Sequence, residues 1–141
     1  MRLVVSGERK IAEKEAVKKA YLWKVNEMVG EARKNFITPI TGQEMIYLGK
    51  EEEAKRFVNS SPLPESFENF PLISAEVGIT AEDGWQLSQI WLFMSGQWKQ
   101  IAAVMESLRL TSLAEMNLAE TKAERDEILE NLQNALNNIS E

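Results

Sequence analysis

Between residues 87 and 108, large apolar side chains recur every three or four positions along the chain. This spacing matches the turn of an α-helix and gathers the side chains on one side of it. A band of large apolar groups this dense predicts a helix that faces a core or an interface. We predict its contact residues to be Leu87, Ile90, Trp91, Met94, Trp98, Ile101 and Met105.

This central helix has a predicted start and an interruption. Thr80 and Asp83 form a capping pattern, with Thr80 as the expected cap. Gly96 lies in the middle of the helix, where it costs about 1 kcal/mol relative to alanine. We expect this glycine to mark a close approach of another helix.

Two further helices are predicted near the ends of the chain. Apolar residues from Leu22 to Phe36 keep the helical spacing, and Ser6 is placed to cap the helix that contains them. Thr121 and Glu124 form a second capping pattern, which predicts a last helix starting at residue 122.

The segment between the first and the central helix is less regular. Thr38-Pro39 ends the first helix, because proline disfavours helical backbone at the residue before it. Residues 45–48 predict a short extended segment, residues 50–58 a short helix, and the proline-containing residues 59–79 a connecting loop. The expected fold is mainly α, a bundle or hairpin of three to five helices. Residues 1–35 would be an N-terminal helix for oligomerisation or attachment, and residues 36–141 a helical domain.

Composition argues against most enzymes. The 141 residues include no histidine and no cysteine, which removes the commonest general base, the commonest metal ligand and thiolate chemistry. A net charge of −6 disfavours nucleic-acid binding, and no apolar run is long enough to span a membrane. We therefore expect no catalytic residues, cofactor, metal, nucleic acid or membrane partner.

Charge is unevenly distributed along the chain. Residues 1–35 carry nine basic and five acidic side chains, whereas residues 80–141 carry four basic and ten acidic ones. This asymmetry predicts complementary surfaces, either within one chain or between copies. The alternative is that both segments are solvated helix faces, since surface ion pairs contribute little.

Two residue groups are candidates for other chemistry. Glu51, Glu52 and Glu53 are consecutive, so they point about 100° apart on a helix and cannot converge on one ion; a solvated first turn is the expected role. Trp85 and Trp91 could form an aromatic platform for a sugar if both are exposed, although tryptophans at this spacing more often pack in a core.

Several motifs occur in a fixed order. A helix ends in a Thr-Pro turn, a Gly-Gln-x-x-x-Tyr-x-x-Lys-x-x-Glu-Ala stretch follows, and a segment similar to Pro-x-Leu-x-Ala-Glu comes next. A helix with a central Trp and an end similar to Ile-Glu-x-x-Arg precedes a final capped helix. The matching residues are Ala32–Pro39, Gly42–Ala54, Pro71–Glu76, Trp98, Val104–Arg109 and Thr121–Leu132.

In this order the motifs resemble a module of bacteriophage and prophage proteins from the tail-fibre region, over residues 30–135. The chain departs from it in having Gly96 and several Met and Trp residues where the module is usually Ala-rich. The resemblance implies a non-enzymatic virion structural protein, made in the host bacterial cytoplasm and located in the virion. Its partners would be copies of itself, with a trimer favoured, and other phage structural proteins.

Two other functions remain open from the sequence. One is a tail-fibre assembly chaperone that is not retained in the virion, and the other is a host-glycan-binding module. For the apolar band of the central helix as a contact surface, we predict that Met94→Lys disrupts either the fold or the association.

Overall fold

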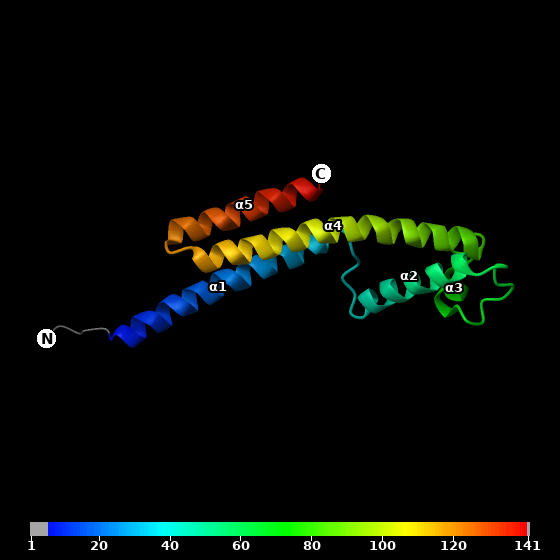
Figure 1. Cartoon of the computed structure of the whole chain (residues 1–141), viewed down its shortest axis with the longest axis horizontal. Coiled ribbons are helices and arrows are strands. Elements are labelled where there is room, and N and C mark those ends of the chain that lie inside the picture. Colours follow the sequence, from blue (N-terminus) through cyan, green and yellow to red (C-terminus); the bar gives the residue numbers. More distant parts are fainter. Residues whose placement is uncertain (1–5, 141) are drawn as a thin grey trace. The chain divides into compact units, whose positions relative to one another are not determined.

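The computed structural model describes residues 6–140 and is mainly helical. The described residues form five helices: α1 (Gly7–Arg33), α2 (Gln43–Asn59), α3 (Pro71–Glu76), α4 (Gly84–Leu118) and α5 (Lys122–Ser140) (Figure 1). No strand occurs in this part of the chain, where the β-type pairing is a single bridge between Val77 and Ala81. The predicted mainly α class is confirmed. No described helix is both long enough and apolar enough to cross a membrane.

The chain folds as two compact units. One unit joins the chain up to Ile37 to the chain from Ile101 onward, and the other comprises Thr38–Gln100. The long helix α4 belongs to both, since its first half lies in the second unit and its second half in the first. In the first unit α1 packs on segments from the other end of the sequence, while the predicted division into residues 1–35 and 36–141 stays a prediction. Residues 1–5 of the expected N-terminal helix lie outside the described part.

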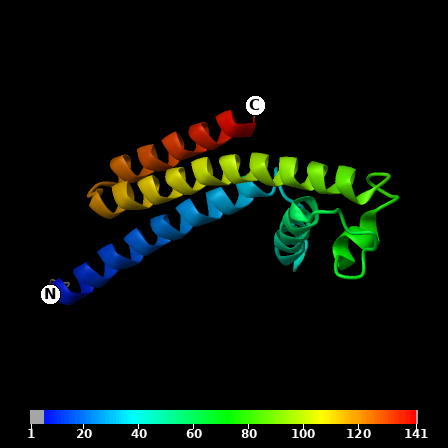
Figure 2. The ribbon, with the colours of Figure 1, turned by 45° about the vertical axis from the view of Figure 1, so that its right-hand side comes forward.

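In the first unit, α1, the second half of α4 and α5 lie side by side (Figures 1 and 2). The apolar residues that recur at helical spacing in α1 and α5 form the buried sides of these two helices. A hydrogen bond from the Tyr21 hydroxyl to Asp126 joins α1 to α5 at 2.8 Å, and Arg33 pairs with Glu106 on α4 at 3.0 Å. The core consists of Val25, Val29, Met105, Met116, Leu132 and Leu136.

In the second unit, α2, α3 and the first half of α4 enclose a separate core. Three phenylalanines lie at its end, with Phe57 edge-on to Phe70 at a centroid distance of 5.4 Å and tilted against Phe67 at 6.1 Å. Edge-on and tilted arrangements suit the charge distribution of aromatic rings. The buried residues are Ala54, Phe57, Phe70, Ile73, Leu87 and Trp91.

Residues 45–48 are helical, so the predicted extended segment is wrong. They belong to α2, which begins at Gln43 directly after Gly42, a residue in the left-handed region with φ +85°. A short extended run without a neighbouring strand would leave backbone groups unpaired, whereas a helix pairs them internally. Gly42 suits this turn because it lacks a Cβ.

Two other boundaries also differ from expectation. The predicted loop 59–79 contains α3, in which Pro71 starts the helix, because proline at the first helical position lacks only an N–H that would have no partner. The cap of α4 is Asp83, whose carboxylate accepts a hydrogen bond from the Gln86 N–H at 2.8 Å, while the Thr80 hydroxyl donates to Glu76. The caps at Ser6 and Thr121 are confirmed by bonds from Arg9 N–H and Glu124 N–H.

Close helix packing occurs at Gly84 and not at Gly96. A Cβ added at Gly84 would lie 2.8 Å from ring atoms of both Phe57 and Phe67, whereas one added at Gly96 would meet nothing within 4 Å. The expectation for Gly96 is therefore wrong within this chain. Nothing in the structure explains the glycine at this position.

These two glycines give a matched pair of variants. We expect Gly84→Ala to destabilise the second unit by about 1–3 kcal/mol, because two aromatic rings must move. Gly96→Ala is expected to stabilise the same helix by up to about 1 kcal/mol. Chemical denaturation followed by circular dichroism measures both changes. Equal effects of the two substitutions would contradict the packing at Gly84.

Candidate functional site

The predicted contact residues do not share one surface. Leu87 and Trp91 are buried in the core of the second unit, and Met105 in that of the first. Ile101 packs partly against the first core, and Trp98 is half-buried. Only Ile90 and Met94 are exposed, by 37% and 59%. Periodicity identified the apolar positions, but the chain itself covers five of the seven side chains at least in part.

An exposed apolar patch remains on the first half of α4, formed by Ile90, Phe93 and Met94. Phe93 is 66% exposed, and sequence analysis missed it because it lies beside the predicted band. The three residues occupy positions i, i+3 and i+4, so they are neighbours on one side of the helix. Leu87, Ser88 and Trp91 point to another side, into the core. Of the predicted interface, the chain leaves Ile90 and Met94 exposed, and Phe93 joins them in the patch.

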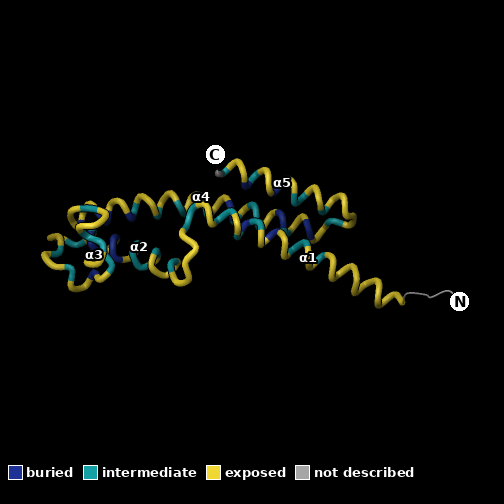
Figure 3. Tube along the Cα trace, turned by 180° about the vertical axis from the view of Figure 1, so that it is seen from behind, coloured by how far each residue is buried: buried dark blue, intermediate teal, exposed yellow. Residues whose placement is uncertain are grey.

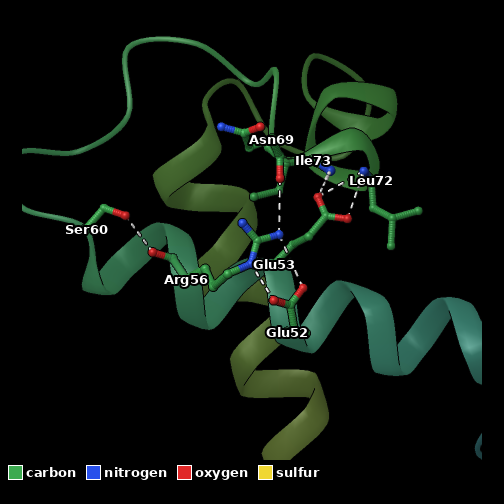
Figure 4. Close-up of polar contacts among 7 residues, drawn as sticks. All are labelled: Glu52, Glu53, Arg56, Ser60, Asn69, Leu72 and Ile73. Atoms are coloured by element: carbon green, nitrogen blue, oxygen red, sulfur yellow. Dashed lines mark hydrogen bonds and ion pairs between the residues drawn. The ribbon is translucent and has the colours of Figure 1, made fainter.

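Elsewhere in the second unit, polar contacts join α3 to α2. The carboxylate of Glu53, only 4% exposed, accepts hydrogen bonds from the backbone N–H of Leu72 at 3.0 and 3.1 Å and of Ile73 at 3.1 Å (Figure 4). Those N–H groups start α3 and have no partner within it. A solvated role for Glu53 was therefore the wrong prediction. The next residue back, Glu52, is exposed and pairs with Arg56.

Other residues of the Gly-Gln-x-x-x-Tyr-x-x-Lys-x-x-Glu-Ala motif also have structural contacts in the second unit. The Lys50 ammonium pairs with Glu76 at 2.8 Å and lies 5.1 Å from the centre of the Trp91 ring. The Tyr47 hydroxyl accepts a hydrogen bond from the Thr38 backbone N–H at 3.4 Å. Hydrogen bonding to the Thr38 side chain, more than this backbone contact, lowers the pKa of the tyrosine. The motif thus encodes the packing of α2 against its neighbours.

Glu51 links α2 to α4 within the second unit. Its carboxylate pairs with Lys55 at 2.8 Å and with Lys99, and it accepts a hydrogen bond from the Ser95 hydroxyl at 2.7 Å. The side chain is 12% exposed, so the expected solvated position is wrong here too. The hydrogen bonds from Lys55, Lys99 and Ser95 lower the pKa of Glu51 to about 2.

This low pKa predicts an acid-dependent contribution to stability. Because the folded pKa lies below the ordinary value of 4.5, the contribution is complete above that value and is lost as pH falls toward 2. At neutral pH, Glu51→Gln should cost about 1 kcal/mol, since both lysines are exposed and screened. Unfolding at several pH values should show that the cost shrinks on acidification. A cost that is independent of pH would contradict this assignment.

The structure bears on potential metal ligands and on the candidate sugar platform. Among residues 6–140 no group of three or more potential ligands is placed to hold a metal ion. Trp91 is buried, so it cannot form a sugar platform with the half-exposed Trp85. The second unit thus combines the exposed apolar patch on α4 with the polar contacts that join α2 to α3 and α4.

Comparison with known proteins yields no relative. No protein-family model, no curated protein and no solved structure matches the chain.

Proposed function

We propose that this chain is a non-enzymatic structural protein of a bacteriophage virion, a tail, fibre or connector component. It would act through contacts with copies of itself and with other virion proteins. The observation that carries the proposal is the patch of Ile90, Phe93 and Met94, since grouped apolar side chains on a surface are typical of protein contact sites. The motif order that resembles the tail-fibre-region module supports the phage assignment.

Several residues of the motif also have contacts within the second unit. Tyr47, Lys50 and Glu53 hold α2 to the rest of the second unit. These contacts form a folding framework on the inner side of the unit, and the patch on the outer side of α4 is left to bind a partner. This arrangement suits a connector, in which the framework positions the α4 patch.

Fractionation of a lysate tests the proposal against the chaperone alternative. Particles released by the bacterium that carries the gene are purified and washed at high salt, and particle and soluble fractions are compared by mass spectrometry. A structural component is expected in the particles. Recovery only in the soluble fraction, bound to fibre protein, would instead support an assembly chaperone.

Met94→Lys tests the role of the α4 patch. Met94 is 59% exposed, so we expect the substitution to leave folding unchanged within about 0.5 kcal/mol. Of the two effects predicted from sequence, only loss of association remains, because a lysine charge would be desolvated in a contact. The measurement is incorporation of the variant into particles, alongside its melting temperature.

Ser107→Lys provides the matched control. Ser107 is exposed on the same helix, thirteen residues after Met94, and the substitution introduces the same charge. The control should be incorporated normally. Equal incorporation of both variants would contradict a contact role for the patch.

A further inference from the structure

The first half of α1 has no covering within the chain. Every residue from 6 to 17 is exposed, and packing against α4 and α5 begins near Tyr21 (Figure 3). The helix therefore extends past the turn between α4 and α5 as a single rod (Figure 1). A helical segment of this length is marginally stable alone in water, and its stability comes from continuity with the packed half.

One face of this segment combines apolar and basic side chains. Ile11 and Val17, exposed by 59% and 44%, lie among Lys10, Lys14 and Lys18. These five residues fall on one side of the helix, at positions i, i+1, i+4, i+7 and i+8. Within the described residues, none of the three lysine ammonium groups forms an ion pair. The face is suited to an acidic partner with an apolar floor.

The other end of the sequence supplies a surface of that kind. A hollow of about 350 Å³ lies between the end of α4 and the start of α5. Leu118, which is 82% exposed, and Ile128 give it an apolar floor. Glu115, Glu124 and Glu127 line it, so three carboxylates match the three lysines.

Helix α1 cannot occupy the α4–α5 hollow of the same chain. Arg125 and Asp126 face α1, since both contact Tyr21, whereas Glu124 and Glu127 line the hollow. On a helix these two pairs of residues point to opposite sides. The straight α1 rod thus lies on one side of α5 and the hollow on the other. The occupant that fits must come from another molecule.

We propose that residues 10–18 of α1 dock into the α4–α5 hollow of a second copy of the chain. Ile11 and Val17 would cover Leu118 and Ile128, and the three lysines would pair with the three glutamates. Different surfaces meet in this contact, so it is head-to-tail and generates a closed ring or an open chain. The inference deepens the proposed function and rests on its premise that copies of the chain associate.

Charge reversal on each surface tests the docking. Light scattering of the wild-type chain over a range of concentrations should show a mass above the 16.0 kDa of one chain, decreasing with added salt. Lys14→Glu and Glu127→Lys should each weaken self-association at least about tenfold. An equal mixture of the two variants should recover it. Where the two variants alternate, each contact pairs either the two original residues or the two reversed ones, so opposite charges face each other in both.

Matched controls carry the same charge changes on other sides of the same helices. Lys19→Glu and Glu130→Lys are exposed positions outside the proposed contact, and both should associate like the wild type. A wild-type chain that stays at 16.0 kDa, reversals without effect, or a mixture that fails to recover would each overturn the docking. Presence of the chain in purified particles is a separate result, so failure of the docking and failure of the proposed function are distinguishable.

Discussion

Replacing Trp91 with alanine is expected to lower the free energy of unfolding of the second unit by about 3–5 kcal/mol. Trp91 is 6% exposed, packs in the core with Leu87 and Ile73, and supports the Lys50 ammonium on its ring. Truncation removes this buried area and leaves a cavity that the aromatic cluster cannot fill. Chemical denaturation followed by circular dichroism measures the loss.

Trp85→Ala is the control for this prediction. Trp85 lies on the same helix but is 44% exposed, so its truncation should cost about 1 kcal/mol or less. If the two alanine variants have equal stability, Trp91 does not occupy the core of the second unit.

Glu53→Ala has the second largest expected effect, a loss of about 3 kcal/mol. The substitution removes the acceptor for the N–H groups of Leu72 and Ile73 and leaves them without partners in a covered position. Glu53→Gln keeps one acceptor oxygen but places an amide donor near the same groups, so about half of the loss is expected. Unfolding measurements on the three proteins should give this order.

The adjacent Glu52→Ala is the control, because Glu52 is exposed and pairs with Arg56 four residues on. Its loss should stay within about 0.5 kcal/mol. Hydrogen exchange adds a local measurement, since Glu53→Ala should increase exchange at the start of α3. Unchanged exchange at Leu72 and Ile73 would contradict the capping role.

The helices at the two ends of the chain were predictable because long periodic segments and capping residues agreed. Ser6 and Thr121 cap α1 and α5 as their sequence patterns indicate. The middle of the chain was not predictable in the same way. Met45-Ile46-Tyr47-Leu48 is too short an apolar run for periodicity to separate strand from helix, and only the packing of α2 on α3 and α4 decides it.

The candidate site was predictable only in part, for two physical reasons. A repeat of apolar residues shows which side of α4 is apolar, but it does not show that the chain buries Leu87, Trp91 and Met105 while exposing Met94. Acidic runs are usually solvated, which is why burial of Glu53 was not expected. Its burial depends on backbone N–H groups some twenty residues away, and no local sequence pattern reveals them. The uneven charge was visible in the sequence. Only the structure shows that basic side chains lie on the uncovered half of α1 and acidic ones line the α4–α5 hollow.

The copy number of the chain in purified, salt-washed particles tests the central claim most directly. Quantitative mass spectrometry compares its peptides with those of a major particle protein in independent preparations. A structural component acting through protein contacts predicts a fixed, reproducible number of copies per particle. Absence of the chain from particles, or an amount that varies with the washing, would contradict the proposed function.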